Sequence, residues 1–310
     1  MVSFFKVKGM EVREPVVAGT FYESDPQKLK KRIEWCFLHP LGPNSLPESP
    51  PGDMRTLIAA QVPHAGYIYS GPAAAHVYYA LHQDGKPETF IILGPNHTGL
   101  GMPVSVYTKG AWRTPLGTIR IDEEVASRLV KKDPLEEDHL AHSGEHSIEV
   151  QLPFLQFIFG NDFLLVPIAM MDQSYETAKS VAEAIIDVLE NIKRDVVILA
   201  SSDMTHYEPH ETAVSKDTKA LEYIEELQIE EFYNYIMKSR LSMCGYGPVM
   251  VAMHIAKYFG ATGLTLKYYT SGDIAGEKSW VVGYASVIFG KGLIKPKKEK
   301  EAIKEALSPV

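Results

Sequence analysis

Cysteine is scarce in this 310-residue sequence, which contains only Cys36 and Cys244, and long apolar runs are absent. So few cysteines exclude the disulfide-stapled scaffold of a small secreted domain. The longest apolar stretches, such as Val196–Ala200, are far shorter than the roughly 20 residues that a membrane helix needs. The amino terminus has neither the apolar segment nor the cleavage site of a secretory signal peptide. We therefore expect a soluble, cytoplasmic protein with no membrane partner.

Several common functional motifs are also missing. The sequence has no GxGxxG, GxxxxGK[ST], HExxH, CxxC or GxSxG pattern, so phosphate-loop nucleotide binding, the common zinc proteases and α/β-hydrolase chemistry have no support. Lys and Arg number 31 against 39 for Asp and Glu, which gives a net charge of −8. A mildly acidic chain does not attract nucleic acid over distance, so we expect no nucleic-acid partner.

Apolar residues make up 45% of the chain and charged residues 23%, as in an ordinary globular protein. Short apolar runs alternate with longer helical patterns, which predicts an α/β fold with a central sheet between two helical layers. The expected strands are Thr56–Val62, Thr89–Leu93, Val104–Tyr107, Phe163–Ile168, Asp195–Ala200, Leu264–Thr270 and Trp280–Phe289. The expected helices are Pro26–Phe37, Pro72–Leu81, Glu123–Lys131, Ile148–Phe159, Tyr175–Asn191, Thr218–Leu227, Glu230–Lys238 and Pro248–Phe259.

No clear domain break interrupts this alternation. The Pro-rich loop at 44–53 follows only 43 residues, too few for a convincing separate domain. We therefore expect one domain over 1–310, with its core at about 13–290. The Lys- and Glu-rich tail at 291–310 is expected to be a surface helix or a frayed end.

Three histidines follow three predicted strands directly: His64, His97 and His206. Ligands of open α/β sheets bind outside the carboxyl ends of the strands, so these imidazoles meet there if their strands are neighbours. Neutral imidazole is a frequent ligand of zinc, iron and copper. The alternative is that each histidine merely caps a turn or packs at a strand end.

Cys244 lies in the segment SMCGYGP between two predicted helices. A thiolate at a helix start is favoured by the helix dipole, and the flanking glycines allow close backbone approach. The alternative is a small buried apolar residue. Cys36 falls within an apolar helical pattern and is expected in the core.

A further polar cluster surrounds His146 and Glu149, at the start of a predicted helix. Either side chain is expected to point into the same crevice as an acid/base or supporting group. The alternative is an ordinary polar helix start, where a carboxylate is favoured by the dipole.

Seven segments, in this order, make the sequence similar to the Memo-like family over about Arg13 to Phe289. They are EPVVAGTFY (14–22), PHAGY (63–67), LGPNH (93–97), RTPLG (113–117), EHSIE (145–149), SSDMTH (201–206) and CGYGP (244–248). The resemblance implies a three-layer α/β sandwich with a mixed, mostly parallel sheet, like the fold of LigB-type extradiol dioxygenases.

The resemblance also implies the site. His64, His97 and Cys244 match the family's metal-binding positions, and His206 matches a fourth histidine, with Asp203 beside it as its orienting neighbour. The substrate pocket is expected to include the three side chains Tyr67, Asn96 and Glu149. Cysteine stands where the dioxygenases have a carboxylate, and its soft thiolate favours iron, copper or zinc over harder metals.

The resemblance leaves two functions open. One is a metal-dependent oxidoreductase that acts on a small aromatic ligand, with His206, Asp203 and His146 as acid/base groups. The other is a module that binds a metal or a phosphopeptide without turnover. In either case the family association implies AMMECR-type and radical-SAM partners in a system that modifies protein or RNA.

Overall fold

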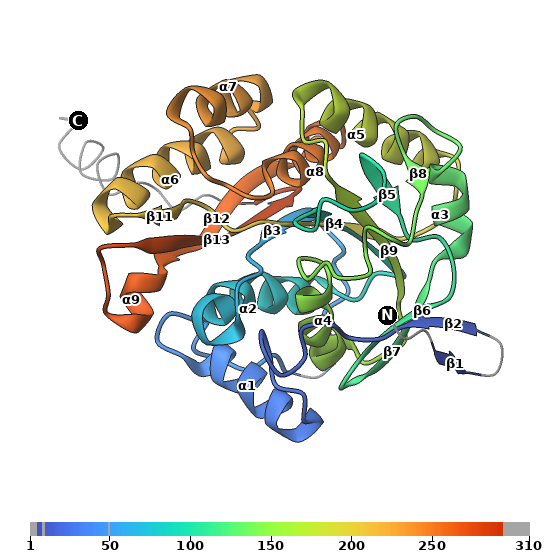
Figure 1. Cartoon of the computed structure of the whole chain (residues 1–310), viewed down its shortest axis with the longest axis horizontal. Coiled ribbons are helices and arrows are strands. Elements are labelled where there is room, and N and C mark those ends of the chain that lie inside the picture. Colours follow the sequence, from blue (N-terminus) through green and yellow to red (C-terminus); the bar gives the residue numbers. More distant parts are fainter. Residues whose placement is uncertain (1–4, 8–9, 49, 294–310) are drawn as a thin grey trace, which may run out of the picture.

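The computed structural model describes residues 5–7, 10–48 and 50–293 (Figure 1). The predicted helix or frayed end at 291–310 therefore lies outside the described residues, apart from 291–293. No helix within the described part of the chain is both long enough and apolar enough to cross a membrane.

The described strands form one mixed sheet. They are β1 (Phe5–Val7), β2 (Met10–Arg13), β3 (Leu57–Val62), β4 (Thr89–Pro95), β5 (Val104–Val106), β6 (Ala111–Thr114), β7 (Gly117–Ile121), β8 (Glu136–Glu137), β9 (Leu164–Met170), β10 (Val196–Ser201), β11 (His206–Glu208), β12 (Thr262–Thr270) and β13 (Val281–Gly290). The main order is β1-β2-β6-β7-β9-β4-β10-β3-β13-β11. Strands β7, β9, β4, β10 and β3 are parallel to one another, whereas β13 joins β3 in antiparallel orientation.

Helices cover both faces of this sheet (Figure 1). They are α1 (Pro26–Leu38), α2 (Tyr67–Asp84), α3 (Glu123–Leu129), α4 (Leu152–Phe159), α5 (Tyr175–Glu190), α6 (His210–Glu225), α7 (Ile229–Ser239), α8 (Tyr246–Tyr258) and α9 (Ser271–Ala275), and a 3₁₀ turn spans Glu149–Gln151. Helices α1, α2 and α4 lie on one side, and α3, α5, α6, α7 and α8 lie on the other. The predicted three-layer α/β fold is confirmed.

The central strands form because their side chains are apolar on both faces. All seven residues of β4 are buried, as expected for a parallel strand between two helical layers. Helix α5 begins at Tyr175, as expected, because Ser174 caps it: the Ser174 hydroxyl accepts the Thr177 N–H at 3.3 Å. The predicted bounds of α2 were wrong at its start: the helix begins at Tyr67 and carries Pro72 inside it, rather than beginning at that proline.

The strand order brings three loops to one edge of the sheet. Strand β10 lies between β3 and β4 and is parallel to both. Their carboxyl ends therefore open on the same side, and the residues after each end are His64, His97 and the segment 202–206. The remote histidines become neighbours through this topology.

Asp217 of α6 anchors the last of these loops. Its Oδ1 accepts the Thr205 N–H at 3.1 Å and the Thr205 hydroxyl at 2.6 Å, and its Oδ2 accepts the Tyr268 hydroxyl at 2.8 Å. Burial raises the pKa of Asp217 from its ordinary value of 3.8 to about 6, although the Thr205 and Tyr268 hydrogen bonds oppose the rise. The carboxyl is therefore more easily protonated in the native protein than in the unfolded chain.

This raised pKa gives a pH-dependent prediction for Asp217→Asn. The stability contributed by the aspartic acid is full below about pH 3.8 and is lost as the pH rises through about 6. Asparagine does not titrate, so the variant should gain about 2 kcal/mol relative to the native protein between pH 4 and pH 7.5, at 1.36 kcal/mol per pKa unit and with part of the effect already lost at pH 4. Urea unfolding of both proteins at the two pH values measures the gain. A difference that is the same at both pH values contradicts the assignment.

Candidate metal centre

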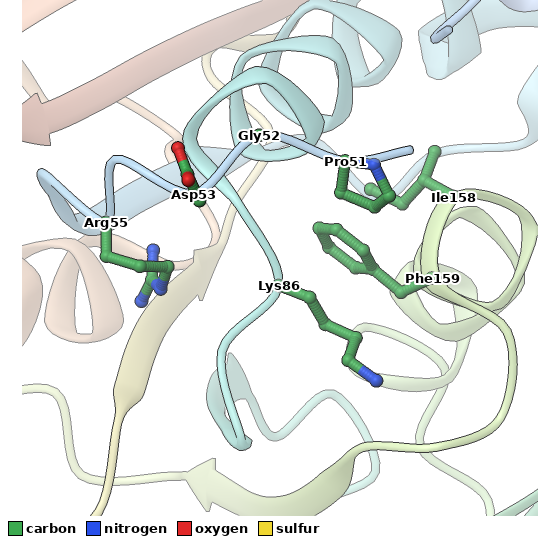
Figure 2. A pocket seen from close by; sticks show the side chains of 7 residues that line it. All are labelled: Pro51, Gly52, Asp53, Arg55, Lys86, Ile158 and Phe159. Atoms are coloured by element: carbon green, nitrogen blue, oxygen red, sulfur yellow. The ribbon is translucent and has the colours of Figure 1, made fainter. Parts of the chain in front are cut away.

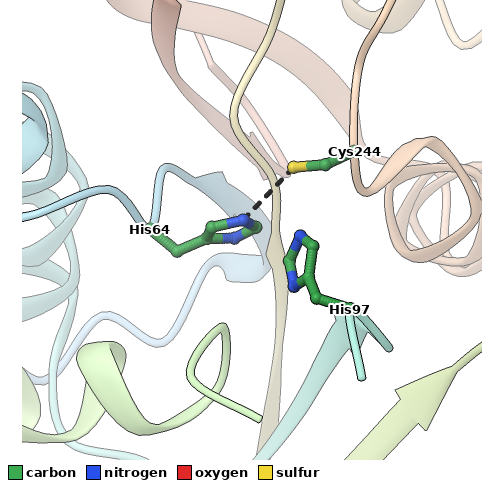
Figure 3. A group of neighbouring side chains, drawn as sticks. All are labelled: His64, His97 and Cys244. Atoms are coloured by element: carbon green, nitrogen blue, oxygen red, sulfur yellow. Dashed lines mark hydrogen bonds between the residues drawn. The ribbon is translucent and has the colours of Figure 1, made fainter. Parts of the chain in front are cut away.

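Three side chains from separate loops converge at the carboxyl edge of the sheet (Figure 3). The ligand atoms of His64, His97 and Cys244 all lie within 4.8 Å of one another. Cys244 Sγ is 3.2 Å from His64 Nε2. Two imidazoles and one thiol at this spacing form a donor set for a transition metal.

His64 is held from two sides. Its backbone N–H donates to Asp203 Oδ1 at 2.8 Å, and its Nδ1 lies 2.8 Å from Ser201 Oγ. Its Nε2 is therefore the nitrogen that faces Cys244 (Figure 3). Burial lowers the pKa of His64 well below its ordinary value, and the neighbouring His146, His97 and His206 rings lower it further. His64 is neutral at physiological pH, as a metal ligand must be.

His97 is oriented by a buried carboxylate. Glu145 accepts the His97 backbone N–H at 2.6 Å and the ring Nδ1–H at 2.9 Å. Burial opposes ionisation of Glu145, but its hydrogen bonds with His97 and the Ser147 backbone lower its pKa to about 2. An ionised carboxylate only accepts, so the His97 ring carries a proton on Nδ1, and Nε2 is the nitrogen left to face the other two side chains.

Cys244 completes the cluster at the entry to α8. Burial raises the pKa of its thiol, the charge of Asp203 raises it further, and the Asp203 N–H to Sγ contact at 3.3 Å opposes the rise. Burial likewise raises the pKa of Asp203 to about 6. Without a metal the sulfur therefore carries its proton, and it lies 3.2 Å from Nε2 of the neutral His64 ring.

His146 forms one wall of the site. Its ring stacks on His97 at a centroid distance of 4.7 Å and meets His64 edge-on at 5.4 Å. The Phe21 ring packs against the His146 ring, with a centroid distance of 4.5 Å. Burial lowers the pKa of His146, although the charge of Glu145 opposes this. The structure thus places this predicted acid/base residue against two of the candidate ligands.

A second possible ligand group consists of His97, Glu145 and His146. Glu145 is less suited to bind a metal because Oε1 already accepts from the His97 ring and from the N–H groups of His146 and Ser147. The cluster with Cys244 has donor atoms that face one another, and it is the better candidate.

His206 lies close enough to His64 to lower its pKa, but Asp203 does not orient it as expected. The Nδ1–H of His206 donates to the backbone oxygens of Met204 and Ser242, each at 2.8 Å. The Asp203 carboxylate instead accepts the His64 N–H. The carbonyl contacts leave Nε2 of His206 as its proton acceptor.

The three residues predicted to line a substrate pocket have structural partners. The Tyr67 hydroxyl is buried and donates to Val150 O at 2.5 Å. Asn96 Oδ1 accepts the backbone N–H groups of Thr98 and Gly99, which shapes the loop after His97.

Glu149 is the clearest departure, because it is 0% exposed and forms an ion pair with Arg13 at 2.7 Å. It also accepts the Tyr22 hydroxyl at 2.7 Å. Glu149 therefore binds the amino-terminal segment that contains Arg13 and Tyr22, rather than facing a ligand. Its position at a helix start concealed this role, since the partners lie more than 120 residues away in sequence.

Sequence reasoning missed two residues that orient the candidate ligands, Glu145 and Ser201. Both stand beside residues that were singled out, yet neither local pattern identifies a partner. Glu145 is 48 residues from His97, and Ser201 is 137 residues from His64. Only the strand order brings each pair together.

A surface hollow of about 570 Å³ lies at the opposite edge of the sheet (Figure 2). Its lining includes Arg55 and Lys86, which precede β3 and β4. Arg55 is paired with Asp84 and Asp195, and Lys86 with Asp162. The hollow thus lacks the converging metal-ligand donors found at the carboxyl edge.

Comparison with known proteins finds a matching family model, similar sequences and a solved structure of low similarity. A family model described as Memo-like protein matches residues 13–288. Proteins named as MEMO1 family proteins are similar over 90% of this chain and 99% of their own: 50% identical in Sulfolobus acidocaldarius, 51% in Methanopyrus kandleri and 52% in Ignicoccus hospitalis. An uncharacterised Escherichia coli K12 protein of known structure is 12% identical, with a TM-score of 0.49 over 76% of this chain and 100% of that one.

Proposed function

This chain belongs to the Memo-like protein family, and from that premise we propose that it is a metal-dependent protein whose metal is held by His64, His97 and Cys244. The observation that carries the proposal is the convergence of these three donors within 4.8 Å. We further propose that the metal is redox-active, iron or copper, and that the protein is an oxidoreductase.

The residues present fit such a metal. Two imidazoles turn Nε2 toward one sulfur, and both Nδ1 atoms have hydrogen-bonding partners in Ser201 and Glu145. Metal-ligating histidines characteristically have such an outer partner. A set of two nitrogens and one sulfur favours iron, copper or zinc over magnesium or calcium. Three protein ligands leave coordination positions open for a substrate.

The bound metal would supply electron transfer and polarisation of a ligand such as a small aromatic molecule. The protein's own residues would supply proton transfer. His146 lies against both candidate imidazole ligands and has a lowered pKa, which suits a base at neutral pH. Nε2 of His206 is left as a second proton acceptor. Because a thiolate replaces the dioxygenase carboxylate, we do not extend the proposal to extradiol ring cleavage.

Phosphopeptide binding is a weaker candidate for this pocket. A phosphate is best held by cationic donors, but burial lowers the pKa values of His64 and His146 and keeps both rings neutral. Association with AMMECR-type and radical-SAM proteins stays a prediction from the family resemblance.

A Co²⁺ titration of the metal-free protein tests the site. We expect one equivalent to bind and to produce a thiolate-to-metal charge-transfer band, because one sulfur is in the donor set. Binding without this band, or no binding, contradicts the proposal.

Oxygen uptake by the iron-loaded and copper-loaded protein across a panel of small aromatic substrates then tests the oxidoreductase function, and no uptake with any of them contradicts that function.

The same titration should depend on pH. Burial raises the pKa of Cys244, so the thiol must lose a proton when the metal binds, whereas the low pKa of His64 means that this ring has none to lose. We expect about one proton released per Co²⁺ and an apparent affinity that rises about tenfold per pH unit between pH 6.5 and 8. Titration in weakly buffered solution with a pH indicator counts the protons. A pH-independent affinity contradicts the assignment of the thiol as a ligand.

A further inference from the structure

We propose that Ser201 is a positioning residue that fixes the tautomer of His64, so that Nε2 carries a lone pair before any metal arrives. The inference rests on the proposed metal site for its biological meaning, but its geometry stands on the contacts of the protein alone. The residues concerned are Ser147, Gln151 and Ser201, which are all at most 1% exposed.

The hydroxyl of Ser201 has three polar neighbours and only one proton. Its Oγ lies 2.6 Å from the carbonyl oxygen of Ser147, 2.8 Å from Nε2 of Gln151 and 2.8 Å from Nδ1 of His64. A carbonyl oxygen only accepts, so the Ser201 proton must point to Ser147. The remaining lone pairs of Oγ then accept from both other neighbours, and the ring proton of His64 is placed on Nδ1.

The orientation of the Gln151 amide is fixed in the same way. Its Nε2 also donates to the carbonyl oxygen of Pro63 at 3.1 Å, and its Oε1 accepts the Tyr78 hydroxyl at 2.5 Å. A reversed amide would set two acceptors against each other at Pro63. Gln151 therefore acts only as a donor toward Ser201, which leaves no alternative pattern for the hydroxyl.

The two candidate imidazole ligands are thus prepared by different means. The His97 ring is set by an ionised carboxylate, whereas the buried His64 ring is set by a neutral hydroxyl. A neutral acceptor fixes the proton without adding a further charge to a buried site that already holds Glu145 and Asp203. Ser201 should therefore determine how readily His64 binds a metal, although it does not touch that metal.

The test uses the full-length metal-free protein with ¹⁵N-labelled histidine, and NMR reads which nitrogen of His64 carries the proton. The Cys244→Ala background is needed because the Cys244 sulfur lies 3.2 Å from Nε2 and could itself bias the position of the ring proton. We expect His64 to keep its proton on Nδ1 in Cys244→Ala and to become a mixture of tautomers in Cys244→Ala/Ser201→Ala. Ser286→Ala in the same background is the matched control, since it also removes a fully buried hydroxyl that donates to a carbonyl.

A proton on Nε2 in Cys244→Ala overturns the inference, even if the double variant fails to fold. An unchanged tautomer in a folded double variant also overturns it. With Cys244 intact, Ser201→Ala should bind Co²⁺ about 10- to 100-fold more weakly, the usual effect of losing an outer partner, and an unchanged affinity contradicts the inference. Failure of the unaltered protein to bind Co²⁺ instead overturns the proposed function and leaves the tautomer result standing.

Discussion

Cys244→Ser should lose the thiolate-to-metal charge-transfer band of the Co²⁺ protein and bind the ion at least about 100-fold more weakly. Loss of an outer partner alone commonly costs 10- to 100-fold in metal affinity, and this substitution replaces a direct ligand. A serine hydroxyl is a much poorer ligand for a soft metal than a thiolate. Absorption spectroscopy during a Co²⁺ titration measures both effects.

Cys36→Ala is the matched control for this experiment. Cys36 is the other cysteine of the sequence, and it is buried in α1 with its sulfur 3.7 Å from Tyr67 O. The control variant should keep the band and the affinity. A band that survives in Cys244→Ser, or that disappears in Cys36→Ala, would show that the sulfur ligand has been assigned incorrectly.

Arg13→Met should destabilise the protein by about 3–5 kcal/mol, because it leaves the carboxylate of Glu149 buried without its cation. The Arg13 side chain is 1% exposed and that of Glu149 is 0% exposed, with 2.7 Å between Nη1 and Oε2. Arg13 also donates to the carbonyl oxygens of His142 and Glu145 at 2.7 Å each. Chemical denaturation at neutral pH measures the loss.

The comparison variant is Arg113→Met, which breaks a similar pair with Glu14 at 2.9 Å. These side chains are 35% and 27% exposed, so water screens the interaction and the expected loss is under about 1 kcal/mol. Equal losses from the two variants would contradict the structural role given to the Arg13–Glu149 pair.

The α/β layers could be predicted from sequence because the central strands are almost wholly apolar. β4 and β10 are apolar over most of their length and buried on both faces, which gives a clear pattern. Strands β6 and β7 were missed because their segments are short: AWRT has no alternation of polar and apolar residues, and GTIRI alternates over only five positions. Each of these short strands is paired on both sides and takes its structure from its partners rather than from its own composition.

The candidate ligands could also be found from sequence, since His64 and His97 directly follow predicted strands. Their outer partners could not, because nothing near Glu145 or Ser201 indicates which imidazole each will meet. For Glu149, the sequence instead suggested a ligand contact that the structure does not show. A carboxylate in a motif suggested ligand binding, but its ion pair with Arg13 depends on the fold of a segment 136 residues away.

The most direct test of the metal site is anomalous diffraction from crystals of protein purified without oxygen or chelators, combined with elemental analysis. The account predicts one iron or copper ion per chain, with its anomalous peak between His64, His97 and Cys244. Metal-free protein that also stays metal-free in crystals soaked with Fe²⁺ or Cu⁺, or a peak elsewhere in the molecule, would contradict it.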